Sequence, residues 1–148
     1  MLIFDEQNQV DSVIGALALR GHIESIVDDI CKKGYRNICW LGIGGTYASC
    51  LQAEIHMKER SGINFYVENA AEYLVTGNRK VGEGTVVIIS SVTGSTSEMV
   101  DGVRKAQEDG AVVIGFVDVA DTKLAKMVDH LISFPLNEQL KFFMTADR

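Results

Sequence analysis

Short apolar runs alternate with amphipathic segments along most of the chain. Uninterrupted runs of β-branched and other apolar residues predict strands that are covered on both faces. The runs of this kind are residues 37–43, 63–67, 85–89, 111–117 and 131–134. Apolar residues that recur every three or four positions predict helices. The expected helices span residues 12–19, 23–33, 48–60, 70–74, 96–109, 123–128 and 138–146.

Strands that alternate with helices predict a parallel sheet joined by right-handed crossovers, with helices on both faces. We therefore expect an α/β fold, a three-layer α/β/α sandwich of the flavodoxin-like type with about five strands. A chain of 148 residues has the usual length of one domain. The expected domain, residues 1–148, comprises N-terminal helices (1–34), a core that carries the motifs (35–135) and a C-terminal helix (136–148).

The second helical segment predicts a single buried face. Its apolar members at helical spacing are Ile23, Ile26, Val27, Ile30 and Cys31. The three cysteines, Cys31, Cys39 and Cys50, have spacings that fit neither a disulfide framework nor a zinc site. We therefore expect buried thiols in a reducing cytoplasm, and no metal.

A turn rich in hydroxyl groups follows the apolar run at residues 85–89. Its members are Ser90, Ser91, Thr93, Gly94, Ser95, Thr96 and Ser97. The spacing of Ser95 and Glu98 predicts a capping box at the start of the next helix. A helix start offers free N–H groups and a favourable dipole, and the hydroxyls add neutral donors for a small anion. A sugar phosphate is therefore the candidate ligand.

A second turn, residues 42–47 (G-I-G-G-T-Y), leaves the first expected strand. Because the carboxyl ends of parallel strands share one edge of a sheet, we expect both turns at the edge where ligands bind. Alone, this turn also resembles half of a dinucleotide-binding fingerprint, with Glu68 as the acid for the ribose. That alternative is weakened by Tyr47, which stands where the fingerprint has its third glycine. A pair of structural turns without a ligand is a further alternative.

The net charge of −6 argues against nucleic-acid binding, because contact with a phosphate backbone needs a basic surface. A bound phosphate would have to be held mainly by backbone dipoles and hydroxyl groups. No apolar run reaches the length of about eighteen residues that a membrane helix needs, so we expect no membrane partner. The histidines His22, His56 and His130 are expected to have structural or solvated roles.

The two turns resemble the motifs of the SIS (sugar isomerase) domain family. Residues 42–46 (G-I-G-G-T) match the family's G-x-G-x-S with threonine for serine, and residues 91–96 (S-V-T-G-S-T) match its S-x-S-G-x-T. Residues 71–73 (A-E-Y) resemble its S-E-[FY] element. Leu124-Ala125 and Val128-Asp129 resemble its L-A-x-x-A-D segment. The resemblance runs from about Gly34 to Pro135 and implies binding of a phosphosugar, a carbohydrate derivative.

The resemblance also implies which residues bind. The residues expected at the phosphate are Gly45, Thr46, Ser91, Val92, Thr93, Gly94 and Thr96. Glu72 is expected near the sugar, and no cofactor is expected. Family members often carry Gln and Glu where this chain has Val92 and Ser95, which leaves the particular sugar open.

No residue is identified as the catalytic base. In double-SIS enzymes the base lies in a second SIS domain, in a segment resembling E-x-[KR]-H-G-P, and this sequence has no such segment. The resemblance therefore implies the N-terminal SIS domain of a sugar-phosphate isomerase or fructosamine-6-phosphate deglycase, with a hexose 6-phosphate or an amino-sugar adduct as ligand. It further implies a cytoplasmic homodimer and a second SIS domain in a longer chain. A non-catalytic module that senses sugar phosphates is the main alternative, and a dinucleotide-binding domain is the third.

Overall fold

The computed structural model of this chain describes residues 6–133, so the helix expected at 138–146 lies outside the described part. The described elements alternate as expected after two N-terminal helices. They are α1 (Glu6–Ala18), α2 (Arg20–Lys33), β1 (Asn37–Gly42), α3 (Gly45–Arg60), β2 (Phe65–Asn69), α4 (Ala70–Thr76), β3 (Thr85–Ser91), α5 (Ser97–Glu108), β4 (Val112–Val117), α6 (Lys123–Met127) and β5 (His130–Ser133).

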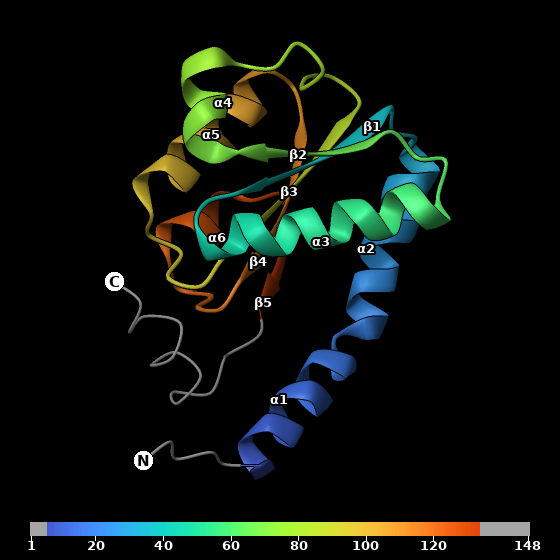
Figure 1. Ribbon diagram of the computed structural model, residues 1–148, viewed down its shortest axis with the longest axis vertical. Helices are drawn as coiled ribbons and strands as arrows, with labels where there is room; N and C mark the ends of the chain where they lie inside the picture. The colour runs from blue at the N-terminus through green and yellow to red at the C-terminus, as the bar shows by residue number, and fades with distance from the viewer. Residues whose placement is uncertain (1–5, 134–148) are drawn as a thin grey trace.

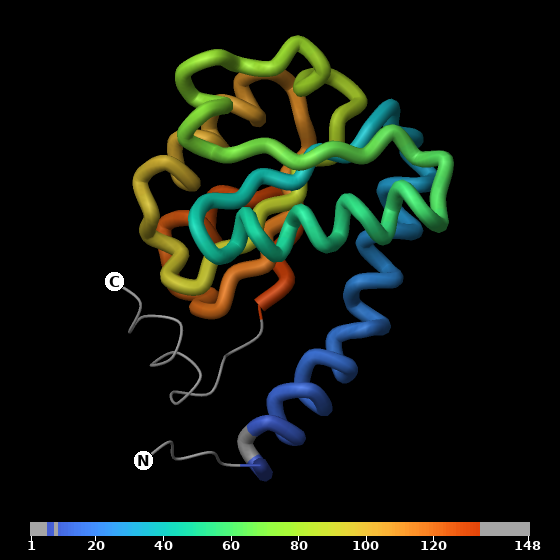
Figure 2. Tube along the Cα trace, in the orientation of Figure 1, coloured from blue at the N-terminus to red at the C-terminus, as the bar shows by residue number. Residues whose placement is uncertain are grey.

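The strands form one parallel sheet in the order β2-β1-β3-β4-β5. In Figure 1, α4, α5 and α6 lie together on the left of the sheet, and α2 lies on the right. This arrangement confirms the expected three-layer sandwich. Figure 2 follows the chain from α1 through the sheet to β5.

Alternating strand residues separate two apolar clusters, one on each face of the sheet. On one face, side chains of β1, β3 and β4 pack against α4, α5 and α6, with Tyr73 and Leu124 completely buried. On the other face, Ile26 and Ile30 of α2 pack against β3, β4 and β5. α3 lies on this second face beside β1. A Cβ on Gly42, at the end of β1, would point at the first turns of α3 and meet Tyr47 and Cys50.

Several expected boundaries differ from the observed ones. β2 begins two residues later than its apolar run, and α3 begins at Gly45 rather than at residue 48. The capping box expected at Ser95 does not form, because α5 starts at Ser97 and its N-cap residue Thr96 makes no side-chain cap bond. Instead, Ser97 Oγ donates a hydrogen bond to the Glu98 carboxylate (2.9 Å). Backbone and Ser97 hydrogen bonds lower the pKa of Glu98.

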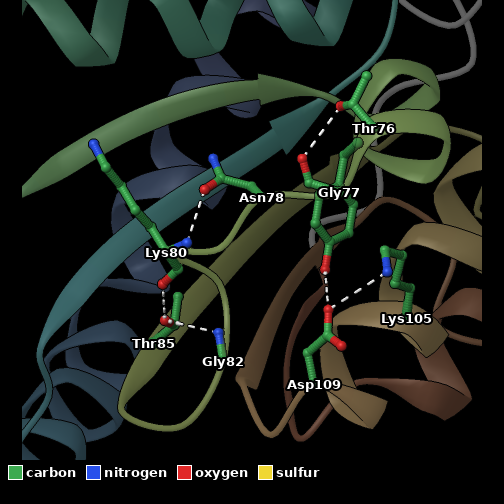
Figure 3. A network of polar contacts seen from close by, with 9 residues as sticks. Thr76, Gly77, Asn78, Lys80, Gly82, Thr85, Lys105 and Asp109 are labelled. Atoms are coloured by element: carbon green, nitrogen blue, oxygen red, sulfur yellow. Dashed lines mark hydrogen bonds and ion pairs between the residues drawn. The ribbon is translucent and has the colours of Figure 1, made fainter.

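A polar network secures the loop between α4 and β3 (Figure 3). Thr85 Oγ1 donates to the Lys80 carbonyl (2.9 Å) and accepts from the Gly82 N–H (3.1 Å). Nearby, the buried Tyr73 hydroxyl donates to Asp109 (3.0 Å), which also pairs with Lys105 (3.7 Å). Burial, and then the bond to Asp109, raise the pKa of Tyr73, so its phenol remains a neutral donor. Because Thr85 is the first residue of β3, this network lies at the opposite end of that strand from Ser91.

The cysteines differ in their surroundings, and one expectation is wrong. Cys39 and Cys50 are completely buried, but Cys31 is exposed, as is its neighbour on α2, Val27. Only part of the expected apolar face of α2 meets the sheet, because the contact is centred on Ile26 and Ile30. Burial is the main factor that raises the pKa of Cys39 to about 12 and that of Cys50 to about 11.

These thiols should therefore react at very different rates. At pH 8 we expect a thiol-specific reagent to label Cys31 rapidly in the native chain, and Cys39 and Cys50 only after unfolding, because the thiolate is the nucleophile. Mass spectrometry of the labelled chain measures this. Cys31→Ser is the control and should remove the fast reaction. Rapid labelling of all three thiols would show that the reagent reaches Cys39 and Cys50 in the native chain, so that these two thiols are not buried.

No helix within residues 6–133 is both long and apolar enough to cross a membrane.

Candidate functional site

The two turns singled out in the sequence leave neighbouring strands at the same edge of the sheet. β1 and β3 are adjacent and parallel, and Leu41 is paired with Ile89. The chain proceeds from β1 to β2 on one side and from β3 to β4 on the other, which makes this the point where strand order reverses. Open α/β sheets bind their ligands at such a point, beyond the carboxyl ends of the strands.

The first turn leads directly into α3. Gly44, with φ of 57°, is the N-cap residue of α3 and supplies no side-chain cap. The Thr46 hydroxyl donates to the Ile43 carbonyl (2.9 Å) and accepts from the Ile43 N–H (3.1 Å), which fixes its position within the turn. A Cβ on Gly42 would lie 2.7 Å from both the N and Cα atoms of Tyr47. The close approach of strand and helix therefore depends on Gly42, and a glycine is not needed at position 47.

The second turn is closed by the side chain of Ser91. Its Oγ accepts a hydrogen bond from the Gly94 N–H (3.0 Å), and Gly94 has a left-handed φ of 61°. Gly94 also accepts from the Leu124 N–H (3.3 Å), which links the turn to α6. The Thr93 and Thr96 hydroxyl oxygens lie 3.5 Å apart at the start of α5. The turn thus presents hydroxyl groups beside the N-terminus of a helix, where the dipole favours an anion.

The structure brings part of the expected set of residues together around one cavity. Thr46, Ser91 and Val92 line a cavity of about 320 Å³, a volume typical of sites for small ligands. Gly45, Thr93, Gly94 and Thr96 lie on the two turns but are not among its lining residues. Glu72 is exposed on α4 and does not line the cavity either. Glu68, the acid of the dinucleotide alternative, accepts a hydrogen bond from Asn78.

Ser90, named above in the hydroxyl-rich turn, also lines this cavity, but sequence reasoning missed several of its other walls. Trp40 of β1 and Phe116 of β4 both line it, and their rings stack with centroids 6.1 Å apart. Asp118 lines it just beyond the end of β4 and is only 8% exposed. Its backbone N–H donates to the Ser91 carbonyl (3.3 Å), which holds it next to the second turn. Its position directly after an apolar strand was the signal that could have identified it.

Chemically, the cavity combines neutral donors, an aromatic wall and one acid. The hydroxyls and the start of α3, which carries Thr46, suit an oxyanion, and a carboxylate accepts hydrogen bonds from hydroxyl or ammonium groups. Within residues 6–133, no group of three or more His, Cys, Asp and Glu side chains could hold a metal ion.

Known proteins match the chain over most of its length. The model of a family described as SIS domain matches residues 33–145. Glutamine–fructose-6-phosphate aminotransferase (isomerizing) of Sulfurisphaera tokodaii is 27% identical over 123 residues, which cover 83% of this chain and 19% of that protein. The HTH-type transcriptional regulator RpiR of Escherichia coli K12 is 28% identical over 97 residues, which cover 66% of this chain and 32% of the regulator. This chain therefore spans about a fifth of the first relative and a third of the second.

Solved structures show the same fold. The C-terminal domain of glucosamine-fructose-6-phosphate aminotransferase from Francisella tularensis superposes with a TM-score of 0.68 at 19% identity. The match covers 76% of this chain and 31% of that structure.

Proposed function

Because the chain belongs to the SIS domain family, we propose that it binds a phosphosugar and that its two turns hold the phosphate. The observation that carries this proposal is the meeting of Thr46 and Ser91 in one cavity at the point where strand order reverses. The starts of α3 and α5 adjoin the two turns, and neither N-cap residue makes a side-chain cap bond. Charge-assisted hydrogen bonds from neutral donors hold a phosphate dianion strongly and with defined geometry. Such a site is compatible with a chain of net charge −6.

The remaining walls fit the sugar. The Asp118 carboxylate would repel a phosphate, so the ligand should point its phosphate at the turns and its hydroxyl or amino groups at Asp118. Trp40 and Phe116 offer an apolar wall for the carbon chain. A hexose 6-phosphate or an amino-sugar adduct carries a phosphate at one end and hydroxyl or amino groups at the other, as this arrangement requires.

The wider role that we propose is that of the N-terminal SIS domain of a sugar-phosphate isomerase or fructosamine-6-phosphate deglycase in the cytoplasm. Isomerisation needs a general base that moves a proton between adjacent carbons. We propose that a second SIS domain or a second copy in a homodimer supplies this base. The matched aminotransferase, of which this chain spans 19%, supports a place within a larger enzyme.

A sensor of sugar phosphates is the second candidate, and its support is the similarity to the regulator RpiR. Calorimetric titration of the chain with fructose 6-phosphate, glucosamine 6-phosphate and NAD tests these proposals. We expect either sugar phosphate, but not NAD, to bind. Binding of NAD alone would overturn the phosphosugar proposal. Turnover of the same sugar phosphates by this chain would exclude a sensor, whereas binding without turnover agrees with a catalytic base that lies in a second domain.

Replacing the hydroxyls of the second turn should weaken sugar-phosphate binding. A hydrogen bond to a charged group contributes about 1.5–3 kcal/mol, so we expect Ser91→Ala and Thr93→Ala each to raise Kd roughly tenfold or more. Ser91 also closes the turn onto Gly94, whereas Thr93 is exposed, so Thr93→Ala separates binding from folding. Thr76→Ala is the matched control, because Thr76 is an exposed hydroxyl on α4 that bonds the Glu72 carbonyl. Affinity unchanged by both turn variants would return these residues to a structural role.

A further inference from the structure

Ser49 of α3 lines the candidate cavity, although it belongs to neither of the two turns. It follows Thr46 by three residues and directly precedes Cys50, so one side of α3 carries all three residues. A Cβ on Gly42 would lie 2.9 Å from Cys50 Sγ, so this side of α3 faces the end of β1. Ser49 is therefore part of the wall that α3 contributes to the cavity.

The hydroxyl group of Thr46 is already used within the first turn. A hydroxyl has one proton to donate and two lone pairs that accept. Thr46 donates its proton to the Ile43 carbonyl (2.9 Å) and accepts from the Ile43 N–H (3.1 Å). The oxygens of a phosphate dianion only accept, so a phosphate could take the Thr46 proton only by breaking the bond that closes the turn. What the first turn offers a phosphate is the set of backbone N–H groups at the start of α3, which have no partner within the helix.

The hydroxyl group of Ser49 has unused acceptor capacity. It donates to the Gly45 carbonyl (3.3 Å), and no residue in the described part of the chain donates to its oxygen. Both lone pairs are therefore available to a ligand, and the residue is exposed. A sugar hydroxyl can donate to Ser49 without breaking any bond of the protein, whereas a phosphate dianion has no proton to donate. Ser49 also lies about 4.5 Å further along the helix axis than Thr46, beyond the helix start that suits a phosphate.

Asp118 supplies a second acceptor from the other side of the cavity. β3 lies between β1 and β4 in the sheet. α3 packs on β1 and β2, whereas Asp118 follows β4, so Ser49 and Asp118 reach the cavity from opposite sides of β3. The backbone of Asp118 is held at both ends, because its N–H donates to the Ser91 carbonyl (3.3 Å) and its carbonyl accepts from Ser133 Oγ (3.2 Å). Acceptors on two walls suit a ligand with several hydroxyl donors.

We propose that Ser49 is a further binding residue of this site and that it accepts a hydrogen bond from a hydroxyl group of the sugar. This inference rests on the proposed binding of a phosphosugar. The phosphate occupies the start of α3 and the second turn, and the sugar extends along α3 past Ser49 towards Asp118. Ser49 then contributes to the affinity for the sugar and not to the affinity for the phosphate.

Calorimetry with two ligands separates these contributions. We expect Ser49→Ala to raise the Kd of fructose 6-phosphate or glucosamine 6-phosphate about two- to tenfold, the effect of losing one hydrogen bond between neutral groups. The Kd of inorganic phosphate, measured by competition with the sugar phosphate, should not change. Alanine has a higher helix propensity than serine, so α3 should stay intact. An unchanged midpoint of thermal unfolding checks this.

Ser25→Ala is the matched control, because Ser25 is an exposed serine within α2 that does not line the cavity. Both Kd values should stay at the wild-type level in this variant. Wild-type affinity for the sugar phosphates in Ser49→Ala would overturn the role of Ser49 and leave the phosphosugar proposal intact. An equal rise of both Kd values would show that Ser49 contacts the phosphate, and would overturn the inference too. Failure of the wild-type chain to bind either sugar phosphate, or of inorganic phosphate to compete, would contradict the proposed function itself.

Discussion

Gly94→Ala is expected to abolish most sugar-phosphate binding and to lower the free energy of unfolding. Gly94 has φ of 61°, and a Cβ there would lie 2.3 Å from Thr122 Oγ1 and 2.7 Å from Thr122 Cβ. The left-handed conformation costs alanine about 1–2 kcal/mol, and overpacking adds about 1–3 kcal/mol. Thr122 cannot move freely, because its Oγ1 caps α6 at Ala125 (3.3 Å) and donates to the Val119 carbonyl (3.1 Å). The turn must therefore shift, and Ser91 shifts with it.

Thermal unfolding and calorimetric titration measure the two effects of Gly94→Ala. Gly77→Ala is the matched control, because Gly77 also has a positive φ, 65°, but its Cβ would meet nothing closer than Lys105 Cε at 4.0 Å. The control should show the backbone strain alone and leave binding unchanged. Wild-type affinity in Gly94→Ala would mean that the second turn does not hold the phosphate.

Gly42→Ala is expected to cause the largest loss of stability among single methyl additions at the site. The new Cβ would lie 2.7 Å from Tyr47 N and Cα and 2.9 Å from Cys50 Sγ. Two of these neighbours are backbone atoms, so relief requires α3 to move away from β1 as a unit. Overpacking of this kind typically costs about 1–3 kcal/mol and occasionally more, and we expect a value at the upper end. Displacement of α3 should also carry Thr46 away from Ser91.

Urea unfolding measures the effect of Gly42→Ala as a lower midpoint with an unchanged slope. Gly21→Ala is the control, because Gly21 lies in α2 with nothing within 4 Å of an added Cβ. Alanine there should raise stability by about 0.5–1 kcal/mol through helix propensity. A Gly42→Ala chain as stable as the wild type would show that α3 is not held against β1 by this close contact.

The two turns offer neutral hydrogen-bond donors, which suit binding of a phosphate and not proton transfer. Hydroxyls and backbone N–H groups can grip a dianion, and no permanent positive charge is needed for that. The Asp118 carboxylate lines the same cavity and suits recognition of the far end of a sugar. In the role proposed here the domain binds and orients its ligand, and the base that transforms it comes from a second domain or subunit.

The sequence by itself determined the order and type of the elements. Strands and helices differ in the local period of their apolar residues, so the runs at 37–43, 85–89 and 111–117 sufficed to predict a parallel sheet with helices on both faces. Local motifs also predicted the two turns, because hydroxyls and glycines that follow an apolar strand are a short-range pattern. Both turns lie at the carboxyl edge of the sheet, as expected. Their binding role stays a prediction until sugar phosphates are titrated.

Only the tertiary structure decided which side chains meet. Strand order and register, set by packing between distant segments, placed Thr46 and Ser91 in one cavity with Asp118, and left Glu72 outside it. The same packing exposed Cys31, which the helical period had placed on a buried face. Contacts of this kind join residues far apart in the chain, so they cannot be predicted from a local sequence pattern.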